Sequence, residues 1–189
     1  GEAIVSHPVI KVISFTGSTK AGERIASIAA PKFKKLSLEL GGKNPNIIFA
    51  DCEWEKMLFN AIRSSFGNQG QICLCGSRIL IEESVYEKFK TDFVGWTKKL
   101  TIGDPLLVES KQGAIVSKAH YEKILRCIET AKEEGGKILC GGIAVKVEGR
   151  CANGYFIQPT IIEGLNQNCQ TNQEEIFGPV VTIQSFKTE

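Results

Sequence analysis

Two cysteines occupy a segment whose residue types could support nucleophilic chemistry. Cys73 and Cys75 lie in residues 66–75 (FGNQGQICLC), where glycines and side-chain amides separate an expected helix from an expected strand. A thiol at such a break can meet backbone N–H groups, which stabilise its thiolate and can also hold an oxyanion. The residue types alone do not choose between the two thiols. A tight turn followed by buried cysteines is the alternative interpretation.

A carboxylate with the surroundings of a general base lies earlier in the chain. Glu39 falls in residues 38–45 (LELGGKNP), between two leucines and just before two glycines. A carboxylate in an apolar stretch is partly desolvated, which increases its affinity for a proton and suits a general base. The alternative is that Glu39 points outward from a half-exposed strand.

Two further segments could bind a nucleotide. In residues 15–22 (FTGSTKAG) a strand ends, Gly17 and Ser18 form a turn, and a helix begins. The free N–H groups and dipole of a helix N-terminus favour an anion such as a pyrophosphate. In residues 174–180 (EEIFGPV) a glutamate could accept hydrogen bonds from a ribose diol, and the phenylalanine could cover a planar ring. An ordinary helix N-cap and a loop entering a strand are the respective alternatives.

Alternating strands and helices must position these segments. Runs rich in β-branched residues predict strands at 10–15, 35–40, 46–50, 77–81, 137–140, 155–162 and 180–186. Apolar residues at spacings of three and four predict helices from the turn at 16–19 to about 30, at 52–65 with Asp51 as N-cap, at 84–100 and at 118–134. We interpret their apolar stripes as core. The alternation predicts an α/β fold with a largely parallel sheet.

Composition excludes several classes of protein. The chain has 189 residues, 42% apolar and 23% charged, which fits a globular domain, or one domain and part of another. No stretch has the roughly 20 apolar residues of a membrane span, and a net charge of +2 gives no electrostatic reason for binding nucleic acid or an anionic membrane. Seven irregularly spaced cysteines argue against a disulfide framework, and with only two histidines no metal site is expected.

The four segments together resemble the aldehyde dehydrogenase family. They occur in the family's order, with Cys73 34 positions after Glu39 and Glu175 102 positions after Cys73. The resemblance covers nearly the whole chain. Within the family, LSLELGGKNP, RSSFGNQGQICLC and GAIVSKAHYEKI are most similar to the 2-aminomuconate and 2-hydroxymuconate semialdehyde dehydrogenases.

This resemblance implies a role for each matching residue. Cys73 matches the catalytic nucleophile and Glu39 the general base, whereas Cys75 has no assigned role. The implied cofactor is NAD, with NADP left open, and no metal is implied. The implied cofactor-binding residues are Gly17, Ser18, Thr19, Lys20, Ala21, Gly22, Leu40, Glu175 and Phe177, with Ser18 at the pyrophosphate and Glu175 at the nicotinamide ribose.

The resemblance also implies a domain organisation. Residues 1–40 match the C-terminal part of a Rossmann-type NAD(P)-binding domain, and residues 41–189 match the α/β catalytic domain, incomplete at its C-terminus. Family chains are far longer, and this one begins at Gly1 with Met57 as its only methionine. We therefore expect a central excerpt that is inactive by itself.

The implied activity is NAD(P)+-dependent oxidation of a small-molecule aldehyde to a carboxylic acid, through a cysteine thiohemiacetal and a thioester. A muconic semialdehyde is the candidate substrate. The full-length protein is expected to be a cytoplasmic homodimer or homotetramer that binds neither nucleic acid nor membrane. Two alternatives stay open. One is a CoA-acylating semialdehyde dehydrogenase, against which Glu39 counts because that branch generally lacks this base. The other is a catalytically silent scaffold or crystallin-like protein of the same fold.

Overall fold

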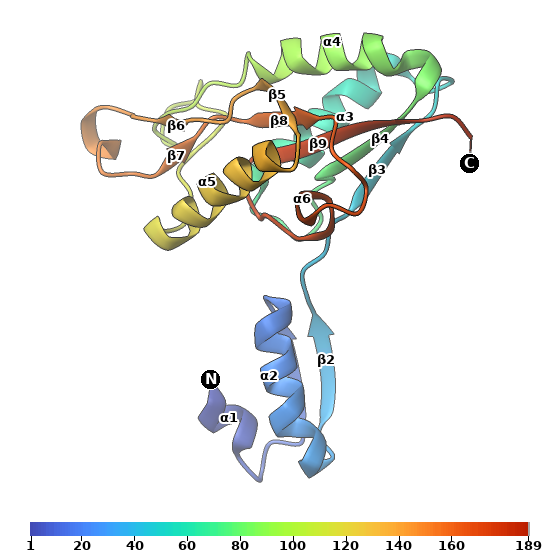
Figure 1. The fold of residues 1–189 in the computed structure, drawn as a ribbon. Helices are drawn as coiled ribbons and strands as arrows, with labels where there is room; N and C mark the ends of the chain where they lie inside the picture. The colour runs from blue at the N-terminus through green and yellow to red at the C-terminus, as the bar shows by residue number, and fades with distance from the viewer. Residues whose placement is uncertain (189) are drawn as a thin grey trace. The chain divides into compact units, whose positions relative to one another are not determined.

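The structure, a computed structural model, describes residues 1–188. The chain forms two compact units, Gly1–Gly42 and Lys43–Glu189 (Figure 1). This division lies two residues after the boundary expected from the sequence.

The first unit is one parallel strand pair with its connecting helix. Its elements are α1 (Glu2–Ser6), β1 (Val12–Thr16), α2 (Thr19–Ala29), the 3-10 helix η1 (Ala30–Lys32) and β2 (Lys35–Glu39). The strands run parallel, so that Val12 pairs with Lys35 and Thr16 with Glu39. A parallel pair needs a crossover, and α2 supplies it. Because both strands end at the same edge, the turn after β1 lies beside the end of β2.

The second unit is built on a five-stranded sheet in the order β3-β4-β9-β8-β5. Its strands are β3 (Pro45–Ile48), β4 (Arg78–Glu82), β5 (Lys137–Cys140), β8 (Thr160–Glu163) and β9 (Val180–Phe186). Strand β5 is antiparallel to β8, and the other neighbours are parallel. A separate antiparallel ribbon joins β6 (Ala144–Val145) to β7 (Phe156–Ile157). The predicted largely parallel α/β sheet is confirmed.

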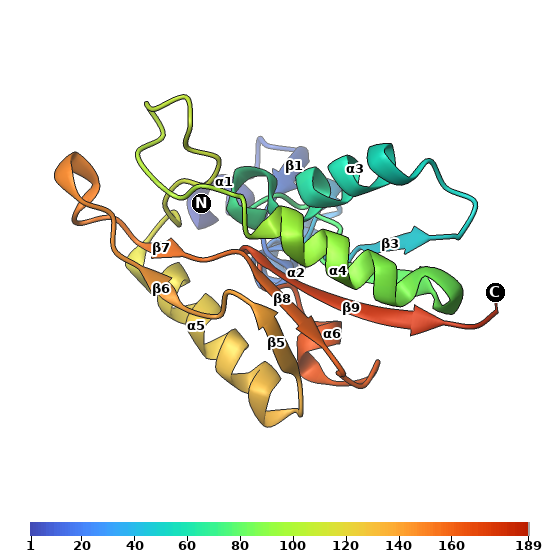
Figure 2. The same cartoon turned by 90° about the horizontal axis from the view of Figure 1, so that it is seen from above.

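Helices cover both faces of this sheet (Figure 2). Helices α3 (Trp54–Phe66) and α4 (Tyr86–Thr97) pack on one face, and α5 (Lys118–Glu133) and α6 (Gln170–Gln173) on the other. Three 3-10 turns complete the unit: η2 (Gly67–Gly70), η3 (Glu83–Val85) and η4 (Gly149–Cys151). Because strand side chains alternate, Val181 faces α3 and α4 while Val180 faces α5.

The sequence predicted the core stripes better than the helix ends. Helix α3 begins at Trp54 with Glu53 at the N-cap position and no side-chain cap, so the prediction of Asp51 as N-cap is wrong. The predicted strand 155–162 is also wrong as one element. It divides into β7 and β8 around Pro159, which has no N–H to donate to a ladder. On either side of this proline the chain pairs with different strands.

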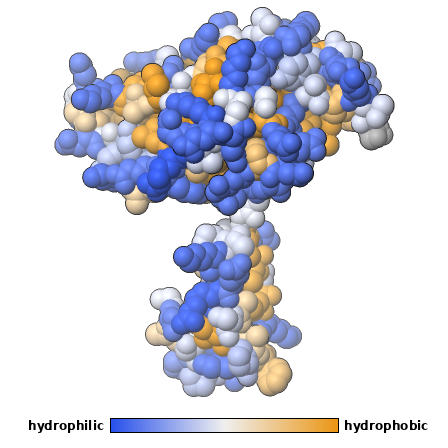
Figure 3. Space-filling model, viewed as in Figure 1, coloured by the Kyte–Doolittle hydropathy of each residue, from blue (hydrophilic) through white to orange (hydrophobic). Residues whose placement is uncertain are grey.

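The surface carries both polar and apolar side chains (Figure 3). In the first unit Phe33 is 95% exposed. All seven cysteines are free; Cys73 is exposed and Cys75 buried, and the other five are half-buried. Within residues 1–188 no helix is long and apolar enough to cross a membrane. The same residues contain no group of three or more acidic, histidine or cysteine side chains arranged to hold a metal ion.

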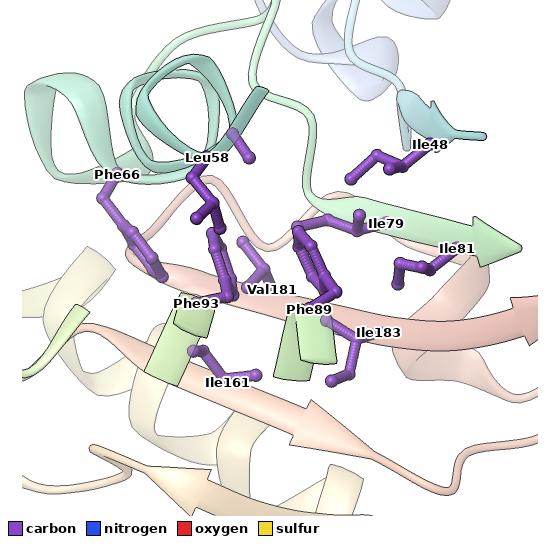
Figure 4. Close-up of a cluster of buried hydrophobic side chains, with 11 residues drawn as sticks. Ile48, Leu58, Phe66, Ile79, Ile81, Phe89, Phe93, Ile161, Val181 and Ile183 are labelled. Carbon is purple, nitrogen blue, oxygen red and sulfur yellow. The ribbon is translucent and has the colours of Figure 1, made fainter. Parts of the chain in front are cut away.

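Aromatic packing under α4 gives a test of the core (Figure 4). Phe93 is fully buried, with its ring centroid 4.9 Å from that of Phe89 and 6.0 Å from that of Phe66. Phe93→Ala in the full-length protein should lower the free energy of unfolding by about 3–5 kcal/mol, because it leaves a cavity. Phe59→Ala, on the 55% exposed Phe59 of α3, is the control and should change it by about 0.5 kcal/mol or less. Denaturant unfolding measures both, and equal effects would contradict this packing.

Candidate active site

In the first unit, the turn after β1 is shaped by glycine and capped by serine. The Gly17 N–H donates to the Glu39 carbonyl (3.0 Å), which joins the turn to the end of β2. A Cβ at Gly17 would lie 2.6 Å from the Phe15 ring, so a larger residue would displace that ring. The Ser18 hydroxyl accepts from the Ala21 N–H (3.3 Å) and serves as the N-cap of α2. The Ser18 hydroxyl is therefore an ordinary N-cap, as the alternative interpretation expected, and the N–H groups of Thr19 and Lys20 remain for an anion.

The end of β2 places Glu39 and Leu40 differently. Leu40 packs against α2, since a Cβ at Gly22 would lie 2.6 Å from its Cδ2 atom. Glu39 is exposed, whereas Leu38 and Leu40 are half-buried. Side chains alternate along the strand, so Glu39 points away from Leu38 and Leu40. Within the first unit these leucines therefore do not shield its carboxylate from water, contrary to the expectation from sequence.

In the second unit, the segment after α3 has an unusual backbone. Asn68, Gln69 and Gly70 have φ values of 49°, 55° and 67°, three consecutive left-handed residues. Such a conformation costs a non-glycine residue about 1–2 kcal/mol, so other contacts must hold it. The Asn68 amide donates to the Gln71 carbonyl (3.2 Å). The Gln69 amide is oriented so that its oxygen accepts from the Gly113 N–H (2.8 Å).

This segment leads into a β-turn that presents Cys73. The Cys75 N–H donates to the Ile72 carbonyl (3.1 Å), which leaves Cys73 and Leu74 as the central residues of the turn. Both are exposed, Leu74 at 81%. Among the described residues, neither central N–H has a hydrogen-bond acceptor. The tight turn considered in the sequence analysis is present, but only Cys75 is buried; the tip of the turn offers the Cys73 thiol with an available backbone N–H beside it.

Cys75 differs from Cys73 in its environment. Its side chain is buried, at 7% exposure. Burial raises the pKa of the Cys75 thiol, and the nearby Cys73 and Glu175 add to the rise. A thiol with a raised pKa carries less thiolate at neutral pH, so Cys75 is the weaker nucleophile. The structure thus distinguishes the exposed Cys73 from the buried Cys75, a choice that the residue types alone did not allow.

The loop that carries Glu175, residues 174–180, lies against residues 67–70, which precede the cysteine turn. A Cβ at Gly70 would lie 2.0 Å from the Gly178 carbonyl oxygen, so the two backbones touch where no side chain fits. Phe177 has φ 59°, again left-handed. The structure therefore brings the predicted cysteine segment and the predicted ribose-binding segment together within the second unit.

Helix α5 anchors that loop through two side chains that sequence analysis missed. The Lys123 ammonium donates to the carbonyls of Glu175 (2.9 Å) and Ile176 (3.3 Å). His120 donates from Nε2 to the Phe177 carbonyl (2.6 Å), which requires the proton on that nitrogen. The acceptors are backbone carbonyls more than 50 residues away in the sequence, so no sequence motif predicts these contacts.

Lys43 adds a buried positive charge near this loop. Its Nζ atom is buried and has no hydrogen-bond partner among the described residues. Burial, with a smaller contribution from Arg78, lowers the pKa of Lys43 to about 8 against the opposing effects of Cys127, Cys169 and Glu175. Lys43 is therefore partly neutral at mildly alkaline pH.

Comparison with known proteins places this geometry in a family. The model of the aldehyde dehydrogenase family matches residues 1–189, and the chain belongs to that family. The 2-aminomuconic semialdehyde dehydrogenase of Mus musculus is 47% identical over 100% of this chain, and that of Homo sapiens is 46% identical. The 4-trimethylaminobutyraldehyde dehydrogenase A of Danio rerio is 40% identical. The chain spans 37–39% of the length of these relatives.

Solved structures show the same fold. The betaine aldehyde dehydrogenase of Staphylococcus aureus in complex with NAD+ has a TM-score of 0.93 and 36% identity. It is matched over 100% of this chain and 37% of its own. A double mutant of that enzyme, in complex with NAD+ and with a BME-modified cysteine, has a TM-score of 0.95 over 38% of its chain. The predicted family and fold are confirmed, and the 2-aminomuconic relatives fit the predicted subgroup.

The contact between the two loops makes a specific prediction. Gly70→Ala in the full-length protein should displace both loops, because the new Cβ would overlap the Gly178 carbonyl and the residue is left-handed. We expect a loss of at least about 2 kcal/mol in unfolding free energy, together with slower alkylation of Cys73. Gly67→Ala, three residues earlier, is the control: its φ is −54° and its Cβ would meet nothing closer than 3.9 Å. Equal stability of the two variants would contradict the close approach.

Proposed function

We propose that the protein carrying this chain oxidises an aldehyde to a carboxylic acid, with Cys73 as the nucleophile. The observation that carries the proposal is the cysteine turn, in which an exposed thiol and an available N–H group share the tip while the neighbouring thiol is buried. Membership of the aldehyde dehydrogenase family supports the same chemistry.

Cys73 and Glu39 have different roles in the proposed oxidation of the aldehyde. The Cys73 thiolate adds to the aldehyde carbon, and the carbonyl oxygen becomes an oxyanion that can accept a hydrogen bond from the Cys73 N–H. When NAD+ is bound, it supplies the acceptor for the hydride that leaves this carbon. Glu39 then takes a proton from water as the water oxygen bonds to the thioester carbon. The C–S bond breaks, which releases the acid and restores the thiolate.

The residues present fit a dinucleotide. The glycine turn at the start of α2 exposes first-turn N–H groups, with Thr19 and Lys20 at the surface. Residues 17–22 would hold the pyrophosphate, with Leu40 packed behind them. Glu175, on its anchored loop, would accept hydrogen bonds from the nicotinamide ribose, and Phe177 would lie beside the ring. The related structures bind NAD+, which supports NAD over NADP.

The relatives support a semialdehyde as substrate, with 2-aminomuconic semialdehyde as the first candidate. A CoA-acylating reaction would use a thiol in place of water, so added CoA would increase turnover. A silent scaffold would bind labelled NAD+ without reducing it. Location in the cytoplasm and assembly as a homodimer or homotetramer stay predictions.

Exchange of each cysteine tests the nucleophile. In the full-length protein, Cys73→Ser should lower kcat by about three or more orders of magnitude, because a serine hydroxyl is a far weaker nucleophile at neutral pH. Cys75→Ser is the matched control and should keep most of the activity. Steady-state NADH formation with the semialdehyde measures both. The reverse pattern would assign the chemistry to Cys75.

Exchange of each glutamate separates two roles. Glu39→Gln keeps the shape but cannot take a proton, so a stopped-flow trace should show a burst of about one NADH per active site followed by very slow turnover. Glu175→Gln should instead misplace the ribose, so hydride transfer slows and no burst appears. Wild-type steady-state turnover of Glu39→Gln would reject its role as base, and the outward-facing interpretation of Glu39 would be preferred.

A further inference from the structure

We propose that Asn44 is a positioning residue that sets the backbone of Cys73 for catalysis. The inference rests on the proposed function, since it concerns the residue assigned as nucleophile. It is carried by one juxtaposition: the Asn44 side-chain amide donates to the carbonyls of both Cys73 and Cys75.

Asn44 is itself held by the sheet. It immediately precedes β3, and the Arg78 N–H at the start of β4 donates to its backbone carbonyl (3.3 Å). Because β3 and β4 pair in parallel from Pro45 and Arg78 onward, the backbone of Asn44 is fixed by the sheet register. Its side chain then reaches from a rigid strand end to the exposed cysteine turn.

The contacts of Asn44 complete the restraint on Cys73. The peptide plane before Cys73 is held because its carbonyl, on Ile72, accepts from the Cys75 N–H (3.1 Å). The plane after Cys73 is held because its own carbonyl accepts from Asn44. With both planes fixed, the φ and ψ angles of Cys73 are fixed, and with them the direction of the Cα–Cβ bond that carries the thiol. Without Asn44 only the first plane has a partner.

The residue type suits this task. A side-chain amide has two N–H hydrogens, and here one serves each carbonyl; the Asn44-to-Cys75 distance is 3.2 Å. A leucine of the same branching has no donor. An ionised aspartate would place oxygens against two carbonyl oxygens, and only its protonated form could donate, to one of them. The two replacements therefore differ in their response to pH.

The test compares Asn44→Leu and Asn44→Asp with wild type in the full-length protein, by the rate of the single-turnover NADH burst. At pH 8 both variants should burst about tenfold to a hundredfold more slowly, because small displacements of a nucleophile have effects of this size. The KM for NAD+ should change by less than about threefold. As pH falls towards 6, the Asn44→Asp rate should rise relative to wild type, whereas the Asn44→Leu ratio should stay flat.

Asn46→Leu is the matched control, since Asn46 lies two residues further along β3 and donates no hydrogen bond to the cysteine turn. It should burst like wild type. If the Leu and Asp variants do not fold, Asn44→Ser, which keeps one donor, is measured by the same assay and should be intermediate. Wild-type burst rates in the folded Asn44 variants would overturn the inference. Absence of NADH formation by wild type would instead reject the proposed function.

Discussion

The backbone contact between Gly70 and Gly178 holds the candidate site of the second unit together. At this point two loops touch without any side chain between them, and Gly178 is also pressed from its other side by Ile124 of α5. The contact explains why the chain keeps left-handed residues on both loops despite their cost. It also couples the cysteine segment to helix α5, whose Lys123 holds the Glu175 carbonyl. The proposed nucleophile Cys73 and the predicted ribose-binding residue Glu175 are thus positioned by one packed unit.

Regular elements were predictable wherever their periodicity was not interrupted. Strand β9 and strand β5 have the predicted bounds, and α5 ends within one residue of its prediction, because long apolar patterns determine which residues are buried. Errors fall where short-range signals compete with tertiary pairing. Asp51 has the chemistry of a cap, yet the helix starts three residues later. Pro159 separates two strands whose residues look continuous, since only the sheet decides which partner each half takes.

In the candidate site, too, some residues could be predicted from the sequence and others could not. Cys73 and Glu175 lie in recognisable segments, and resemblance was enough to propose their roles. The residues that shape those segments were missed: Asn44, His120 and Lys123 bind backbone carbonyls 29, 57 and 52 residues away. A backbone carbonyl is common to every residue type, so its partner leaves no signature in the sequence. The environment of Glu39 was also mispredicted from its neighbours in sequence. Leu38 and Leu40 lie on the opposite side of the strand, so they do not desolvate its carboxylate.

Because the chain is synthesised from its N-terminus, the two loops that touch at Gly70 and Gly178 are not available to each other at the same time. Gly178 follows Gly70 by 108 residues, and the ribosome adds about 5–20 residues per second. The cysteine segment is therefore synthesised about 5–20 seconds before the loop that supports it exists. During this interval strand β4 has β3 on one edge but lacks its other neighbour β9, so the nascent chain carries an open strand edge next to the cysteine segment. Such contacts of high sequence separation slow folding, because the long loop between the two segments must close before the contact can form.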